Sequence, residues 1–68
     1  MKMWVARDKD GKIWLYFKVK PIKGRDVWMN GIGGDYCEVS DTFPIVKWED
    51  QEPTPVKFYH NNTLVIKD

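Results

Sequence analysis

Alternation of apolar and polar residues dominates the first third of the chain. Residues 3–7 are β-prone, and from Lys12 to Lys20 apolar and polar positions alternate as in a strand. Between them, residues 8–11 are typical of a turn, because an Asp side chain can bond its own backbone and Gly11 tolerates the left-handed conformation. We therefore predict a β-hairpin, which Pro21 ends because it cannot donate to a strand ladder.

The predicted second strand, residues 12–20, has two different faces. One face is aliphatic and uncharged, which favours the core, and consists of Ile13, Leu15, Phe17 and Val19. The opposite face combines aromatic and basic side chains: Lys12, Trp14, Tyr16, Lys18 and Lys20. This aromatic-basic face is the candidate binding face of the protein.

Shorter β segments follow. We predict a loop over residues 22–26, a short strand at 27–29, and a hairpin that joins this strand through the glycine-rich residues 30–35 to 36–39. Residues 40–44 suggest at most one helical turn, and 49–55 an exposed connection. Further strands are predicted at 45–48, 56–59 and 63–66, with a turn at 61–62.

No segment has a sustained helical period of apolar residues. The fold class is therefore all-β, with five or six short strands and no long helix, and we favour an SH3-like barrel or an antiparallel meander. An OB-fold normally needs a longer chain. With 68 residues, the chain has room for one small domain, residues 1–68.

Cysteine content and the distribution of charged and apolar residues indicate the cellular compartment. Cys37 is the only cysteine, so no internal disulfide is possible, and a lone thiol favours a reducing compartment such as the cytoplasm. No stretch approaches the roughly 18 apolar residues of a membrane span, and a charge interrupts the start before any signal segment could form. We therefore expect a cytoplasmic address and no membrane partner.

Charge is unevenly distributed along the chain. Residues 1–34 contain eight Lys and Arg against three Asp, whereas residues 35–68 contain three Lys against seven Asp and Glu. Such asymmetry indicates either a basic binding face or two oppositely charged segments that lie side by side, and we favour the second interpretation.

Several sequence patterns partly match known ligand-binding motifs, but required residues are missing. In a calcium-loop alignment, Asp8 and Asp10 are ligands, but Ala6 and Phe17 occupy two essential positions. The glycines of residues 31–34 lack the third glycine of a dinucleotide fingerprint, and Tyr36 stands in its place. The acidic residues 49–52 are typical of a solvated loop.

The chain has only one thiol and one histidine. We expect Cys37 to be a small core residue and His60 to lie at a turn, which disfavours both a Cys–His dyad and a zinc site. The glycosylation sequon at residues 61–63 lacks a secretory signal beside it, so we interpret it as a chance match. No catalytic residue, metal ligand or cofactor site is predicted, and we expect no enzymatic activity.

Two segments of the chain resemble a known group of small proteins. They are Trp4-Val5-Ala6-Arg7-Asp8-Lys9-Asp10-Gly11 with Trp14-Leu15-Tyr16, and Phe43-Pro44-Ile45-Val46-Lys47-Trp48-Glu49-Asp50 with Glu52-Pro53-Thr54. The chain resembles, over roughly residues 3–57, small uncharacterised proteins encoded by gut bacteria, their phages and mobile elements. The resemblance implies a stand-alone cytoplasmic accessory protein, and it brings no activity and no site residues.

Two functional hypotheses follow. The first is a protein-interaction or structural accessory module, which binds a protein partner or a second copy through a strand edge or the aromatic patch. The alternative is a nucleic-acid-binding module, in which bases stack on Trp14 and Tyr16 while Lys12, Lys18 and Lys20 meet phosphates. The solvent exposure of Trp14 and Tyr16 is the decisive observation for that face.

Overall fold

The computed structural model describes residues 2–60 and 63–67, and these residues form β-strands and connections without any helix. The seven strands are β1 (Met3–Arg7), β2 (Ile13–Phe17), β3 (Ile22–Lys23), β4 (Trp28–Met29), β5 (Asp35–Glu38), β6 (Thr54–Tyr59) and β7 (Thr63–Ile66). The all-β prediction is thus confirmed. No helix of the described residues is long and apolar enough to cross a membrane.

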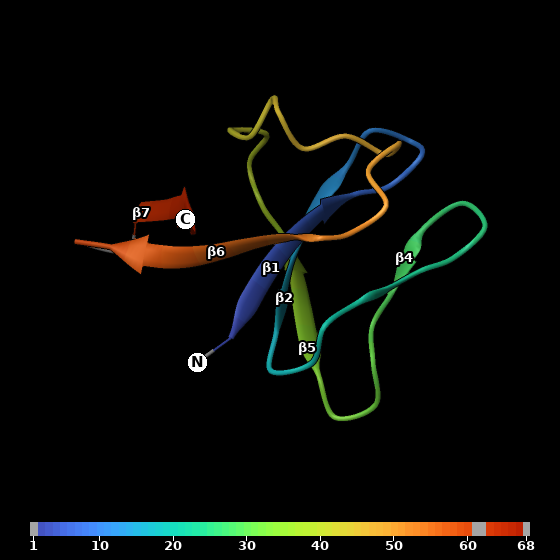
Figure 1. Cartoon of the computed structure of the whole chain (residues 1–68), viewed down its shortest axis with the longest axis horizontal. Helices are drawn as coiled ribbons and strands as arrows, with labels where there is room; N and C mark the ends of the chain where they lie inside the picture. Colours follow the sequence, from blue (N-terminus) through green and yellow to red (C-terminus); the bar gives the residue numbers. More distant parts are fainter. Residues whose placement is uncertain (1, 61–62, 68) are drawn as a thin grey trace.

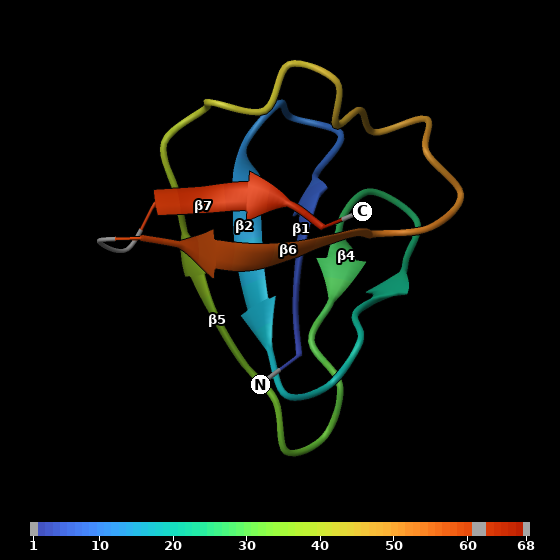
Figure 2. The same ribbon diagram turned by 60° about the vertical axis from the view of Figure 1, so that its left-hand side comes forward.

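Five strands form one antiparallel sheet in the order β5-β2-β1-β6-β7, and β3 and β4 form a separate two-stranded sheet. The β6–β7 hairpin crosses one face of the β1-β2-β5 segment, whereas the β3–β4 hairpin lies on the opposite side (Figures 1 and 2). Within the described residues β5 and β7 are the two ends of the sheet, which does not close into a barrel.

The first hairpin is confirmed, although its second strand is shorter than predicted. At the turn, the Gly11 N–H donates to the Asp8 carbonyl at 3.0 Å, and Gly11 has a φ of 96°. Strand β2 ends at Phe17, because Lys18 adopts a φ of 73° and breaks the alternation. Lys18 and Lys20 consequently lie beyond the strand, and the predicted strand to residue 20 is wrong.

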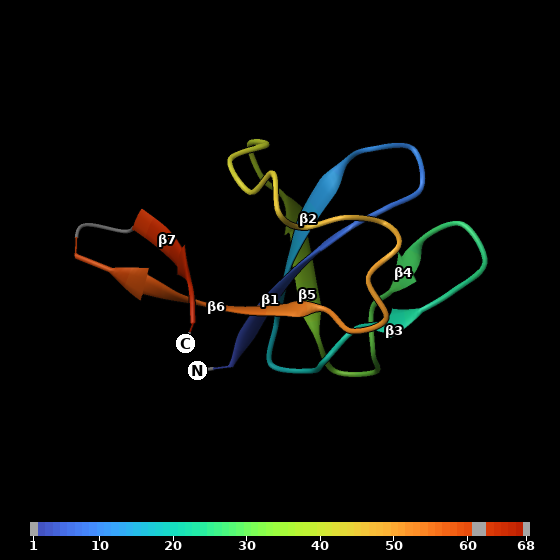
Figure 3. The ribbon, with the colours of Figure 1, turned by 45° about the horizontal axis from the view of Figure 1, so that its top comes forward.

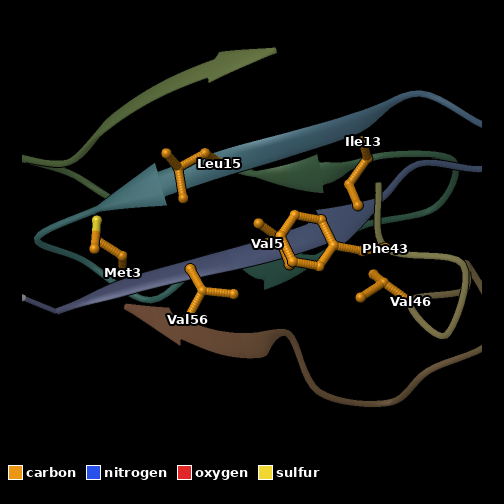
Figure 4. Close-up of a cluster of buried hydrophobic side chains, with 7 residues drawn as sticks. All are labelled: Met3, Val5, Ile13, Leu15, Phe43, Val46 and Val56. Atoms are coloured by element: carbon orange, nitrogen blue, oxygen red, sulfur yellow. The ribbon is translucent and has the colours of Figure 1, made fainter. Parts of the chain in front are cut away.

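The predicted aliphatic face of β2 does face the core. Figure 4 shows the buried cluster, which combines both strands of the first hairpin with β6 and the connection before it: Met3, Val5, Ile13, Leu15, Phe43, Val46 and Val56. Phe43 and Val46 come from a turn, in which the Val46 N–H donates to the Phe43 carbonyl at 3.0 Å. The strand predicted at residues 45–48 is therefore wrong, and residues 40–44, for which at most one helical turn was predicted, contain no helix.

The predicted pairing of residues 27–29 with 36–39 is also wrong. Strand β4 pairs with β3 instead, and the Gly24 N–H donates to the Val27 carbonyl at the turn between them. Strand β5 pairs with β2, where it forms an edge of the sheet. Cys37 is consequently exposed rather than part of the core, because no strand covers β5 from its open side.

The C-terminal strands lie close to their predicted positions. Strand β7 has the predicted bounds, and β6 begins two residues earlier than expected, at Thr54. Pro53 is buried, so the connection over residues 49–55 is only partly exposed. His60 lies at a turn with a φ of 54°, as expected. The turn predicted at 61–62, and the sequon that begins there, lie outside the described residues.

The two oppositely charged parts of the sequence meet in the fold. Of the four ion pairs among the described residues, three join a basic side chain from residues 1–34 to an acidic one from residues 35–68. These are Arg7–Asp41, Lys18–Asp35 and Lys20–Glu52. The charge asymmetry along the chain therefore reflects neighbouring segments in space, as we favoured.

Candidate ligand-binding groove

The five residues of the aromatic-basic face do not form one exposed surface. Tyr16 is only 2% exposed and Trp14 is half-buried, whereas the three lysines are exposed. Lys18 pairs with Asp35 at 3.3 Å, and Lys20 pairs with Glu52 at 2.5 Å. Lys12 lies just before β2 and makes no ion pair with another described residue.

The β3–β4 hairpin covers this face of the sheet. Trp28 on β4 is buried against Ala6 and Tyr16, and Trp14 and Trp48 pack at the margin of the cluster. The Tyr16 hydroxyl donates to the Trp28 carbonyl at 3.3 Å. Burial raises the pKa of Tyr16 to about 12, and the nearby Asp8 and Tyr36 act in the same direction. The chain thus forms a second, aromatic core on the outer side of β1 and β2.

Asp8 holds the β3–β4 hairpin against the sheet. The residue is 7% exposed, and its Oδ1 accepts a hydrogen bond from the Trp28 backbone N–H at 2.9 Å. Burial raises the pKa of Asp8, and the hydrogen bond from Trp28 offsets part of this effect. The Trp14 indole lowers the pKa slightly as well, although its N–H completes no hydrogen bond. No ion pair links Asp8 to a cation within the described part of the chain.

Lys23 fixes the hairpin from the other side. Its Nζ donates to the backbone carbonyls of Trp48 at 2.6 Å and Asp50 at 2.9 Å. The same ammonium lies 4.4 Å from the centre of the Trp48 ring and 5.8 Å from that of Trp28. Favourable contacts between cations and aromatic rings are therefore already part of this fold.

A hollow of about 400 Å³ opens between the hairpin and the sheet. We call it the aromatic groove, and it is lined by Asp8, Trp14, Tyr16, Trp28 and Tyr36, together with Val27, Met29 and Asn30 of the hairpin. The Tyr36 ring lies edge-on to Trp14 at 5.6 Å and nearly parallel to Tyr16 at 6.1 Å between centroids. Tyr36, Val27 and Met29 are each about half exposed, so solvent reaches these walls.

Two buried donors in this region have no partner. The indole N–H groups of Trp14 and Trp28 make no hydrogen bond with any described residue. Unpaired buried donors are uncommon in folded proteins, because each loses its hydration without compensation. Both indoles line the aromatic groove, so this feature marks the groove as an unusual environment.

Of the eight groove residues, the sequence analysis identified only Trp14 and Tyr16, and the missed ones include Asp8, Trp28 and Tyr36. Asp8 was assigned to the turn, yet it is Asp10 whose Oδ1 accepts the Lys12 N–H there at 2.9 Å. The surplus of one Asp in a four-residue turn was the available signal. Tyr36 reaches the groove only because β5 pairs with β2, a pairing between strands that are not consecutive. Trp4 does not line the aromatic groove and lies instead in a different hollow, beside Pro55.

Comparisons with protein-family models, with curated proteins and with solved structures found no match to this chain. The resemblance to small phage and bacterial proteins therefore stays a prediction. No group of three or more His, Cys, Asp or Glu that could hold a metal ion occurs within residues 2–60 and 63–67.

Proposed function

We propose that this protein is a non-enzymatic interaction module that binds an extended segment of a partner protein along β5, with one partner side chain in the aromatic groove. The observation that carries the proposal is the position of β5. This strand is an open edge of the sheet, all four of its residues are exposed, and its Tyr36 is also a wall of the groove.

The hydrogen-bond pattern of β5 supports strand addition. The Val39 N–H donates to the Ile13 carbonyl at 3.1 Å, so Asp35 and Cys37, which share the parity of Val39, exchange bonds with β2. The backbone groups of Tyr36 and Glu38 consequently point to the open side. A partner strand can pair with them, as in other cases of peptide binding at sheet edges.

Charge favours a basic partner over a second copy. Glu38 lies on the exposed edge strand without an ion pair among the described residues, whereas Asp35 is paired with Lys18 at 3.3 Å. Two copies paired through β5 would bring their Glu38 carboxylates close to each other. A basic extended segment avoids that repulsion. Self-association, the other partner expected from the sequence, is therefore less favoured at this edge.

The nucleic-acid alternative has less support. Tyr16 is buried, and of the three lysines only Lys12 has no carboxylate partner among the described residues. Stacking of bases requires accessible ring faces, and affinity for phosphates requires unpaired positive charge. The acidic edge beside the groove opposes polyanion binding further.

By analogy of fold alone, strand order supports the same site. In place of the SH3-like barrel favoured from the sequence, we propose an open version of the five-stranded OB arrangement. Strands β1, β2 and β5 form a meander, and the β6–β7 hairpin adds to β1. In OB-folds the second and third strands bind oligonucleotides and oligosaccharides, and here these strands are β2 and β5, so the analogy supports the position of the site and not the class of its ligand. The exposed Cys37 is compatible with the reducing, cytoplasmic address that we propose.

Selection from a displayed peptide library, followed by amide chemical-shift mapping, tests this function. We expect enriched peptides to be basic and extended, and to shift the amides of Tyr36 and Glu38. In Glu38→Pro the open-edge N–H is lost while the bonds between β5 and β2 remain, so peptide affinity should fall at least tenfold.

Glu38→Ala is the matched control, since it removes the carboxylate but keeps the N–H. We expect it to retain more of the affinity than the proline variant does. Equal affinity of Glu38→Pro and Glu38→Ala would refute strand addition. Peptides that map to another face, oligonucleotides that shift the groove at physiological salt, or a library that yields no binder would each refute the proposed function.

A further inference from the structure

The aromatic groove combines features that are costly unless a cation enters it. Asp8 is one of its lining residues, buried and without a cationic partner among the described residues. Aromatic residues from three elements line the same groove: Trp14 and Tyr16 from β2, Trp28 from β4 and Tyr36 from β5. A buried carboxylate without a counter-ion is unfavourable, and it attracts positive charge.

We propose that the aromatic groove is a binding site for an alkylammonium group, the methylated or free ammonium of a lysine side chain on the partner segment. This inference rests on the proposed function and specifies what enters the groove. The rings provide the negative faces that attract a diffuse cation, and Asp8 provides the opposite charge.

The groove suits an organic cation better than a metal ion. Calcium and magnesium require about six oxygen ligands, whereas Asp8 is the single carboxylate among the lining residues. Ring faces offer a metal ion no comparable ligand. A tetraalkylammonium, in contrast, needs no hydrogen-bond acceptor and gains from contact with several rings at once.

The hydrogen bonds of Asp8 also disfavour a guanidinium. Arginine binds carboxylates best through two parallel N–H···O bonds, which require both carboxylate oxygens. Here Oδ1 already accepts the Trp28 N–H at 2.9 Å, so a bidentate guanidinium would have to share that oxygen with the backbone donor. An ammonium or methylammonium interacts as a point charge and does not require that second oxygen.

Lys23 shows that the chain already uses this chemistry, but this lysine does not line the groove. Its ammonium lies against Trp48 and Trp28 and is held by two backbone carbonyls. The residues that line the groove include no lysine or arginine. The charge of Asp8 is therefore available to a ligand.

The test compares choline with its neutral carbon analogue, 3,3-dimethylbutan-1-ol, which has the same shape without the charge. Binding is followed through the indole N–H resonances of Trp14 and Trp28 in the intact protein. We expect choline to shift both resonances and to bind about tenfold more tightly than the neutral alcohol, which is the range of a desolvated contact between a cation and aromatic rings.

Two pairs of variants test which residues are responsible for choline binding. Asp8→Asn keeps an oxygen for the Trp28 N–H, removes the charge and should reduce the preference for choline to that of the rings alone, whereas the exposed Asp26→Asn should retain it in full. Tyr36→Ala should weaken choline binding several-fold, and Tyr59→Ala, which removes an equally exposed ring elsewhere, should not. Because Tyr36 is 56% exposed, that pair remains informative if Asp8→Asn fails to fold.

Equal affinity for choline and the alcohol, choline shifts outside the groove, or no shifts at all would overturn the cation site. The strand-addition experiment with Glu38→Pro is independent of this result. Peptides that bind β5 while choline fails would leave the proposed function standing without the cation site. If neither choline binding in the groove nor peptide binding along β5 is observed, both the cation site and the proposed function are refuted.

Discussion

Arg7 on β1 binds the segment before β6 that contributes Phe43 and Val46 to the core. Its replacement is the most informative stability experiment. Its guanidinium donates to the carbonyls of Val46 at 2.7 Å, Phe43 at 3.1 Å and Gly11 at 2.7 Å. It also forms two hydrogen bonds to the Asp41 carboxylate. The Arg7 side chain is 15% exposed, whereas that of Asp41 is 63% exposed.

The expected effect of Arg7→Met follows from the carbonyls and not from the ion pair. An unsatisfied buried carbonyl costs about 1–3 kcal/mol. Arg7→Met leaves the partly buried Val46 carbonyl without its partner, whereas the Phe43 carbonyl keeps the hydrogen bond from the Val46 N–H. We therefore expect a loss of about 1–3 kcal/mol. A domain of this size has only about 3–5 kcal/mol of stability, so Arg7→Met should lose a large part of it.

Urea unfolding followed by tryptophan fluorescence measures the effect, provided that the m-value is unchanged. Asp41→Asn is the matched variant: it removes the charge of an exposed partner and leaves the carbonyl bonds of Arg7 intact. Exposed ion pairs contribute little, so this variant should lose much less stability than Arg7→Met. The reasoning is refuted if the two variants are equally destabilised, or if Arg7→Met is as stable as the wild type.

Three further predictions concern titration, packing and reactivity. Because burial raises the pKa of Asp8 in the folded state, ionisation of this carboxyl opposes folding. The stability of Asp8→Asn relative to the wild type should therefore increase as the pH rises from the pKa of the unfolded chain through the raised pKa of the folded state. Equilibrium unfolding at several pH values measures this difference, and a decrease with pH would contradict the prediction. A Cβ at Gly31 would lie 2.3 Å from Val19 Cγ1, so Gly31→Ala should cost about 1–3 kcal/mol, and in thermal melts Val19→Ala should recover part of that loss. The exposed Cys37 should react with a thiol reagent in the folded protein nearly as fast as in urea, and a requirement for denaturant would contradict its exposure.

Local signals in the sequence predicted the local structure well. The first hairpin follows from alternation and from the Asp8–Gly11 turn, and β7 follows from its β-branched residues. The aliphatic face of β2 was assigned to the core for the same reason: an uninterrupted apolar row excludes water. These features depend on residues that are close in the chain.

Long-range pairing was not predictable from these patterns. The β5–β2 pairing makes Cys37 an exposed edge residue, and it brings Tyr36 beside Trp14 and Tyr16. Alternation specifies which side chains share a face, but it does not specify which strand is the neighbour. Of the candidate site, Trp14 and Tyr16 were therefore identified, whereas Asp8, Trp28 and Tyr36 were not. The exposure of that face was left open by the sequence, because the β3–β4 hairpin that covers it is positioned by long-range packing.

The β3–β4 hairpin is a separate two-stranded sheet, inserted between β2 and β5, which pair directly with each other (Figure 3). One wall of the groove can therefore change while every hydrogen bond of the five-stranded sheet is retained. For the proposed binding function, such an arrangement suits diversification, because substitutions at the half-exposed Val27 and Met29 alter the lining of the groove without altering the framework. Asn30 is less suitable, since its side chain donates a hydrogen bond to the Gly34 carbonyl. Val27 and Met29 are thus the positions to randomise in a search for new ligands of the groove.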